Sequence, residues 1–187
     1  VDGYYDSSGF PVIINITQHE FFSDSDVSDT LYWTNLKLVQ THIRKIEYLL
    51  QDIKTIAPSV KDFPFHMECR VDSNTGEYIP IEVNPLRFSG YGTCEIAHYA
   101  YNINPYKAFF KDKVPRWAEK SRHLENDKEI IYGFVCINKE LEHRQLHDIF
   151  DEVLEYRFIP EPTETKIIVL FRTNDIDALK LKLEKII

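Results

Sequence analysis

Two glutamates and an asparagine lie on the two predicted strands of one hairpin. Glu68 belongs to FPFHMECRVD (63–72), and Glu82 and Asn84 belong to YIPIEVNPL (78–86), which follows the turn SNTGE. If the turn is symmetric, Glu68 stands directly opposite Glu82 across the hairpin. Two facing carboxylates destabilise a sheet unless positive charge lies between them. A divalent cation supplies that charge, and carboxylate and amide oxygens are ligands that magnesium prefers.

The alternation of side chains along a strand predicts which residues share a face with these oxygens. On the first strand, His66 and Arg70 lie on the same face as Glu68. The apolar residues of the second strand lie on its other face and are expected to pack on the core: Ile79, Ile81 and Val83. The polar face then either lines a site, with Arg70 supplying part of the positive charge, or is a solvated surface with a Glu–Arg ion pair.

The order of residues in this hairpin and the following loop resembles the metal- and phosphate-binding end of the ATP-grasp superfamily. These are ATP-dependent carboxylate–amine and carboxylate–thiol ligases. The matching residues are Glu68 in FHMECR and, in IEVNPLRFSG, Glu82, Asn84, Pro85 and Arg87. The resemblance extends more loosely over residues 1–110.

The resemblance implies a role for each matching residue. Glu68, Glu82 and Asn84 would hold one or two magnesium ions that bridge the phosphates of ATP. Arg87 would be the catalytic residue, because its guanidinium would contact the transferring phosphoryl group or the oxygens of an acyl phosphate. The implied cofactors are therefore ATP and magnesium.

Two further residues are assigned to cofactor binding together with the arginine. Arg70 would support the charges around the metal, and Gly90 would let the backbone approach the acyl phosphate. ATP would phosphorylate a small-molecule carboxylate, and an amine or similar nucleophile would then displace phosphate to form an amide-type bond.

The sequence also departs from the pattern of the superfamily. Leu86 places Arg87 one position later than in the commoner N-P-R form, which leaves the target of the arginine open. The superfamily also grips the adenine and the inner phosphates with an earlier subdomain, for which this chain has no matching segment. We therefore expect the C-terminal portion of a ligase, a fragment that is inactive or nearly so in isolation.

The remaining segments predict the elements that position this hairpin. Apolar residues recur at helical spacing from Asp29 to Ala57, and Pro58 ends the run. The expected elements of the first part are a hairpin over 1–17, a loop to 29, the long helix over 29–57, the acidic hairpin, a helix from about 93 toward 105 and a short helix over 105–110.

The second part follows a charged linker over 111–128. Its predicted elements are a strand over 129–138, a helix over 139–157, a strand over 165–173 and a helix over 174–187. The expected fold class is α/β (α+β): an ATP-grasp C-terminal subdomain over 1–110, with an antiparallel sheet backed by helices, and a small appended βαβα subdomain over 125–187. Because such a unit has an open sheet edge, it should dock on the main domain or pair with another copy.

The charge and composition of the chain limit the classes of partner that it is expected to bind. The 187 residues carry a formal net charge of −8 and no basic run, which argues against nucleic acid and anionic membranes as partners. No apolar run approaches the roughly 20 residues that cross a bilayer, so we expect a cytoplasmic protein. The alternative to the ligase is a non-catalytic binding or dimerisation module whose acidic hairpin is only a polar face. A homodimer is compatible with both functions.

Overall fold

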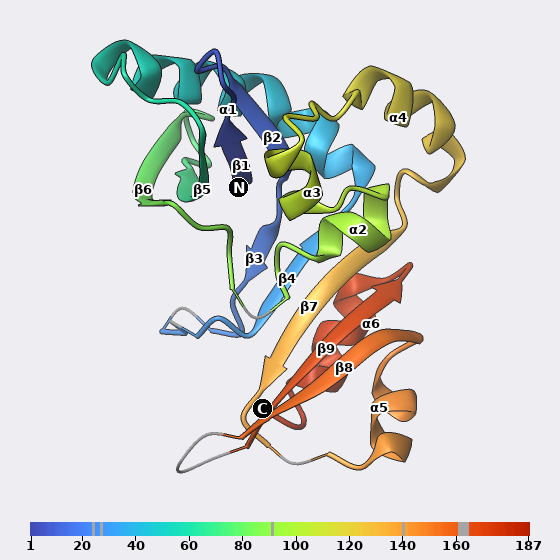
Figure 1. The fold of residues 1–187 in the computed structure, drawn as a ribbon. Helices are drawn as coiled ribbons and strands as arrows, with labels where there is room; N and C mark the ends of the chain where they lie inside the picture. The colour runs from blue at the N-terminus through green and yellow to red at the C-terminus, as the bar shows by residue number, and fades with distance from the viewer. Residues whose placement is uncertain (24, 27, 91, 140, 161–164) are drawn as a thin grey trace.

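Two antiparallel sheets with helices packed on them make up the described part of the chain (Figure 1). The computed structural model describes residues 1–23, 25, 26, 28–90, 92–139, 141–160 and 165–187. The expected mixed fold, with antiparallel sheets backed by helices, is confirmed. The helices are α1 (Leu36–Ile56), α2 (Ile96–Tyr101), α3 (Pro105–Phe110), α4 (Trp117–His123), α5 (His143–Ile149) and α6 (Ile176–Leu183), with a 3₁₀ turn, η1 (Glu125–Asp127).

The first sheet contains both predicted hairpins, in the strand order β2-β1-β5-β6. Its strands are β1 (Asp2–Tyr5), β2 (Pro11–Asn15), β5 (Phe63–Val71) and β6 (Tyr78–Pro85). The turn between β1 and β2 is held by Asp6, whose side chain accepts hydrogen bonds from the backbone amides of Ser8 (2.9 Å) and Phe10 (2.7 Å). Because β1 lies between β2 and β5, the two hairpins form one continuous sheet.

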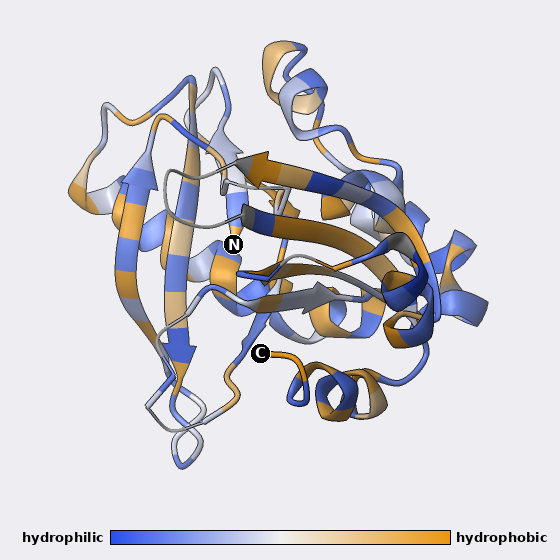
Figure 2. Ribbon diagram, turned by 90° about the horizontal axis from the view of Figure 1, so that it is seen from below, coloured by the Kyte–Doolittle hydropathy of each residue, from blue (hydrophilic) through white to orange (hydrophobic). Residues whose placement is uncertain are grey.

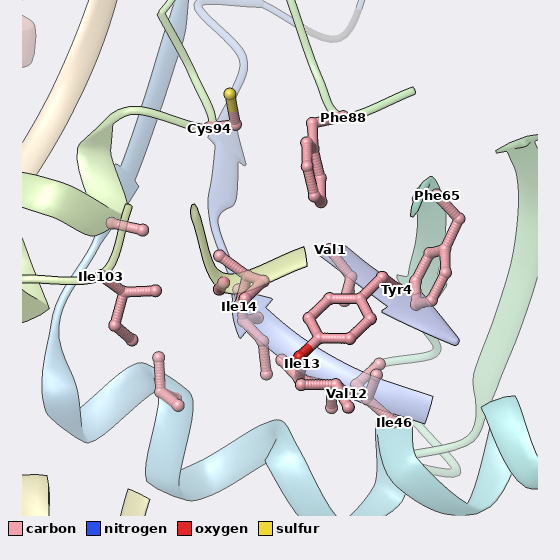
Figure 3. Packing of buried hydrophobic residues seen from close by; sticks show 14 of the residues in the cluster. Val1, Tyr4, Val12, Ile13, Ile14, Ile46, Phe65, Phe88, Cys94 and Ile103 are labelled. Atoms are coloured by element: carbon pink, nitrogen blue, oxygen red, sulfur yellow. The ribbon is translucent and has the colours of Figure 1, made fainter. Parts of the chain in front are cut away.

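Helices cover both faces of the first sheet. The hydroxyl of Tyr5 donates to the carbonyl oxygen of Leu50 in α1 at 2.9 Å. The ring of the preceding residue, Tyr4, meets Phe109 of α3 edge-on, with centroids 5.6 Å apart. Successive side chains of a strand point to opposite faces, so α1 and α3 lie on opposite sides of the sheet. Figure 3 shows Tyr4 among core residues that come from several elements.

Helix α1 begins later than the expected start at residue 29. Residues 31–34 (LYWT) form strand β4, and Asn35 caps the helix by accepting a hydrogen bond from the amide of Leu38 at 2.7 Å. The aromatic and β-branched side chains of this segment suit a strand. Its backbone pairs with β3 (Gln18–Glu20) on one side and β7 (Ile131–Ile137) on the other, so tertiary pairing overrides the helical spacing of its apolar residues.

The second sheet joins strands from both ends of the chain, in the order β3-β4-β7-β9-β8. These strands are β3 (Gln18–Glu20), β4 (Leu31–Thr34), β7 (Ile131–Ile137), β8 (Glu152–Pro160) and β9 (Thr165–Thr173). The predicted helix over 139–157 is therefore wrong in its second half, which is strand β8 paired with β9. The appended unit is βαββα instead of βαβα, and a short strand, β3, lies in the expected loop.

The segment predicted as a linker, 111–128, also contains structure. It includes α4 and η1, and Trp117 of α4 packs edge-on against Tyr101, with ring centroids 5.1 Å apart. The indole nitrogen of Trp117 donates to the carbonyl oxygen of Ile13 at 3.1 Å. The division at 1–110 and 125–187 stays a prediction, and the sheet crosses it because β4 pairs with β7.

The two faces of the second sheet pack on different partners. Val135, Ile137 and Val169 lie in the cluster that includes residues of α5 and α6. Residues of the opposite parity, among them Phe134 and Ile168, pack with α2 instead. In Figure 2 the strands of this sheet are largely orange, in keeping with burial of both faces. The second sheet therefore presents one of its faces toward α2 and the loop that precedes it.

No helix in the described part of the chain combines the length and the apolar character needed to span a membrane.

A substitution at Gly133 in β7 tests whether β4, β7 and β9 pack as one sheet. A Cβ added there would meet the carbonyl oxygen of Tyr32 in β4 at 2.8 Å and would overlap the ring of Phe171 in β9. We expect Gly133→Ala to lower the free energy of unfolding by about 1–3 kcal/mol in urea titrations. Gly90→Ala is the control, since nothing lies within 4 Å of its added Cβ. Equal stability of the two variants would contradict this packing.

Candidate functional site

The acidic hairpin has the register that its sequence predicts around the two glutamates. Glu68 pairs with Glu82, and His66 pairs with Asn84. The side-chain amide of Asn84 donates to the carboxylate of Glu82, so these two predicted ligands are in contact. The hairpin therefore presents two facing carboxylates and one amide on adjoining strands.

The register breaks immediately beyond this pair. Cys69 pairs with Pro80, so the pairing skips Ile81. Proline has no backbone N–H to donate to the ladder, and such residues are usually confined to edge strands and bulges. Arg70 lies beyond the break, exposed and opposite Ile79. Its assignment to cofactor binding stays a prediction.

The apolar residues of β6 do not pack on the core as expected. Ile79, Ile81 and Val83 are 50%, 54% and 41% exposed. Strand β6 is the edge of its sheet, so it has a neighbouring strand on one side only. Apolar alternation in the sequence is therefore correct for the first part of β5, where Phe65 and Met67 are fully buried, but wrong for β6.

A buried carboxylate joins two of the segments that form the site. Asp2 is 2% exposed, and it pairs with His66 across β1 and β5. Its oxygens accept hydrogen bonds from the backbone amide of Ser89 (2.7 Å), the hydroxyl of Ser89 (2.6 Å) and Nδ1 of His66 (3.1 Å). Nε2 of His66 lies 3.5 Å from Oε1 of Glu68. Asp2 therefore links the loop after β6 to the strand that carries Glu68.

The environment of Asp2 decides its protonation. Burial alone would raise the pKa of this carboxyl, but the hydrogen bonds from His66 and Ser89 lower it. Asp2 is therefore ionised near neutral pH. An ionised carboxylate only accepts hydrogen bonds, so Nδ1 of His66 carries the proton that it donates.

Leu86, the residue that separates Pro85 from Arg87, is accommodated by an unusual backbone. Its φ is 64°, in the left-handed region, and its side chain is 77% exposed. Its amide still donates to the carbonyl oxygen of Pro64 at 2.8 Å. The chain turns here and then buries Phe88, which meets Tyr106 edge-on. The extra residue therefore bends the chain without displacing the loop from the sheet.

A pocket of about 390 Å³ lies between the first sheet and the second. One group of lining residues comes from β5 and the loop after β6: His66, Glu68, Arg87, Ser89, Gly90 and Thr93. The other group comes from the second sheet and its loops: Ser28, Asp29, Thr30, Tyr32, Phe134, Cys136, Asn138 and Lys166. Of the predicted site residues, Glu68, Arg87 and Gly90 line the pocket, whereas Arg70, Glu82 and Asn84 do not.

Sequence reasoning missed the pocket-lining residues of the second sheet and the role of Asp2. The contact of Asp2 with Ser89 joins residues far apart in the chain, and no local pattern predicts it. Alternation over the predicted strand 165–173 would have placed Lys166 on one face with Ile168. The helical spacing over 29–57 includes Tyr32, so the sequence pattern predicts no strand alternation for this residue.

The metal-binding prediction can be compared with the donors present. The described residues contain no group of three or more His, Cys, Asp or Glu side chains that could hold a metal ion by themselves. Magnesium, however, often binds through one or two carboxylates and completes its shell with water and substrate phosphates. The two carboxylates of Glu68 and Glu82, with the amide oxygen of Asn84, have the chemistry for such a partial shell.

The pH dependence of stability tests the role of Asp2. We expect Asp2→Asn to lower the free energy of unfolding by about 1.5–3 kcal/mol near pH 7, because hydrogen bonds to a charged group are lost. Since folding lowers the pKa of Asp2 from 3.8, this contribution is present above that value and is lost as the pH falls through the lower folded pKa. Urea unfolding of both proteins between pH 7 and pH 2.5 measures it.

The control is Asp52→Asn, which changes an exposed carboxylate on α1 and should shift stability by less than about 0.5 kcal/mol. A difference between the wild type and Asp2→Asn that stays constant down to pH 2.5 would contradict the assignment.

A family model described as ATP-grasp domain matches residues 1–95, which is more than half of the 187 residues and includes the acidic hairpin and the loop after it. Searches of the curated proteins and of the solved structures gave no match. The chain therefore belongs to the ATP-grasp family.

Proposed function

We propose that this chain carries the metal- and phosphate-binding end of an ATP- and magnesium-dependent ligase that joins a carboxylate to an amine. ATP-grasp proteins are generally ATP-dependent ligases that form carbon–nitrogen bonds, and the family match is the basis for ATP-dependent ligase activity here. The observation that carries the finer proposal is the pairing of Glu68 with Glu82 beside a pocket lined by Arg87 and Gly90.

Glu68, Glu82 and Asn84 are the proposed metal-binding residues. When bound, magnesium would neutralise the charge of the ATP phosphates. The facing carboxylates explain why this hairpin needs a cation, since like charges directly opposite each other destabilise a sheet. The imidazole of His66 lies 3.5 Å from the carboxylate of Glu68 and is hydrogen-bonded to Asp2 through its other nitrogen. These contacts help to fix the position of Glu68.

The residues on the loop after β6 are suited to phosphoryl transfer. Arg87 would bind the oxygens of the transferring group, as a guanidinium can donate two hydrogen bonds to them. Gly90 is open on its side-chain side, with nothing within 4 Å of an added Cβ, so a ligand can approach its backbone. Asp2 fixes the intervening Ser89 through two hydrogen bonds, which positions this loop before a substrate binds.

The proposed reaction has two steps. A substrate carboxylate oxygen attacks the γ-phosphorus of ATP, the bond to the bridging oxygen breaks, and ADP leaves. The nitrogen of the amine then attacks the carbonyl carbon of the acyl phosphate, the carbon–oxygen bond to phosphate breaks, and the amine loses a proton as the amide forms. The products are ADP, phosphate and an amide.

The competing proposal is a binding or dimerisation module, and one observation favours it. Strand β6 is an edge strand with the exposed apolar residues Ile79, Ile81 and Val83, which are suited to contact with another protein surface. A homodimer would use such a surface without needing the acidic pair. The two proposals therefore differ in what they require of Glu82.

Substitution of Glu82 separates them. With the full-length protein we expect Glu82→Gln to weaken binding of MgATP at least tenfold and to lower ATP-dependent phosphate release by roughly 100-fold or more, because charge at the metal is lost. Isothermal titration with MgATP and a phosphate-release assay measure the two effects. Glu77→Gln, in the exposed turn of the same hairpin, is the control. Unchanged binding and unchanged release in Glu82→Gln would exclude the ligase.

A further inference from the structure

The pocket beside Glu68 is lined by charges of both signs. Its described lining residues include the carboxylates of Glu68 and Asp29 and the cations of Arg87 and Lys166. Lys166 already interacts within the chain. In the proposed reaction, magnesium would neutralise Glu68, and the transferring phosphoryl group would neutralise Arg87. Asp29, in the loop before β4, is a negative charge that these roles leave without a counter-ion.

The carboxylate of Asp29 is oriented by Tyr32. The hydroxyl of Tyr32 on β4 donates to Oδ1 of Asp29 at 2.5 Å. The ring of Tyr32 stacks on His19 of β3, with centroids 4.2 Å apart, and its centroid lies 6.2 Å from that of Phe134 on β7. Burial raises the pKa of Tyr32, as do its hydrogen bond to Asp29 and the charges of Asp29 and Glu68, so the phenol stays a neutral donor. An ionised carboxylate has roughly four acceptor positions, so this hydrogen bond orients Asp29 and leaves positions for a ligand.

The loop that carries Asp29 is also fixed from its other end, by Asp26. The side chain of Asp26 accepts hydrogen bonds from the backbone amides of Phe22 (2.9 Å) and Ser28 (2.8 Å) and from the hydroxyl of Ser28 (2.6 Å). These hydrogen bonds lower the pKa of Asp26 to about 2, so it is ionised at neutral pH and keeps accepting them. Ser28 and Thr30, the neighbours of Asp29 in the sequence, line the pocket as well. Asp29 is therefore held at the pocket before any ligand binds.

The charges of Asp29 and Arg87 lie on different segments around one pocket. Asp29 precedes β4, whereas Arg87 follows β6, and both line the same space of about 390 Å³. A ligand that carries only a carboxylate leaves Asp29 without a counter-ion, and a second anionic group would be repelled there. A small molecule with one carboxylate and one ammonium group matches both charges, and a pocket of this volume suits its size.

We propose that the carboxylate substrate is a small amino acid, with its carboxylate at Arg87 and its ammonium group at Asp29. This proposal rests on the proposed function, which places activation of the carboxylate beside Glu68 and Arg87. The ammonium group donates to the acceptor positions of Asp29 that Tyr32 does not use. Because hydrogen bonds between ionised groups are stronger than those between neutral groups, this contact selects against acids that lack the amino group.

Matched acids with and without an amino group test the proposal. Dissociation constants of the full-length protein are measured by titration calorimetry, with and without magnesium and a non-hydrolysable ATP analogue. The amino acids are glycine, alanine, β-alanine, γ-aminobutyrate and δ-aminovalerate, and the matched acids run from acetate to pentanoate. We expect the preferred amino acid to bind at least about tenfold more tightly than its matched acid. Asp29→Asn, which keeps an acceptor oxygen for Tyr32, should reduce this ratio toward one, and Asp29→Glu should restore part of it.

Asp177→Asn is the control, because Asp177 is exposed on α6 and does not line the pocket. It should leave the ratio unchanged. Equal binding or no binding of the matched acids by the wild type, or an unchanged ratio in Asp29→Asn, would overturn the proposal. Propylamine binding as tightly as γ-aminobutyrate would also overturn it, since Asp29 would then bind the amine nucleophile.

The nucleotide separates this proposal from the proposed ligase. A loss of affinity for magnesium and the ATP analogue in Asp29→Asn would overturn the assignment of Asp29 to the substrate, because its carboxylate would then bind the metal. Failure of the wild type to bind the nucleotide would instead overturn the proposed ligase, while the ratio of the matched acids would still decide whether Asp29 binds an ammonium group.

Discussion

The buried carboxylate of Asp2 is the interaction on which the arrangement of the site depends. It accepts hydrogen bonds from the amide and hydroxyl of Ser89 and from His66, so three segments distant in sequence meet at one charge. A buried carboxylate without such donors would be costly, and removal of one partner would leave the others unsatisfied. This requirement couples the loop that carries Arg87 and Gly90 to the strand that carries Glu68.

The pairing of β4 with β7 has an equally direct consequence for the site. This pairing places strands β7 and β9 beside residues 1–95, which the family model matches. Side chains of these two strands therefore line one side of the pocket. Tyr32 lies at this junction, on a strand that is short and would not be stable by itself. The unit that the sequence presents as an appendage thus takes part in shaping the space next to Glu68.

Local patterns predicted the acidic hairpin well and the remainder less well, for physical reasons. The pairing of Glu68 with Glu82 follows from turn length and alternation, both local properties. The exposed Ile81 could not be predicted, because exposure of an edge strand depends on the order of strands in the sheet. The apolar spacing of residues 31–34 continues that of α1 and so predicts a helix, and only pairing with the distant β7 makes them a strand. Asp2 has no local signal either, since its partners lie far along the chain.

Native-state hydrogen exchange at the amide of Ser89 tests the central role of Asp2 most directly. That amide donates to Asp2 at 2.7 Å, so it should be strongly protected in the wild type. In Asp2→Ala, where the acceptor is absent, we predict exchange at least about tenfold faster at Ser89, beyond any change at the amide of Val169 in the core of β9. Equal protection of Ser89 in the two proteins would contradict the account, because the loop would then be held by something other than this carboxylate.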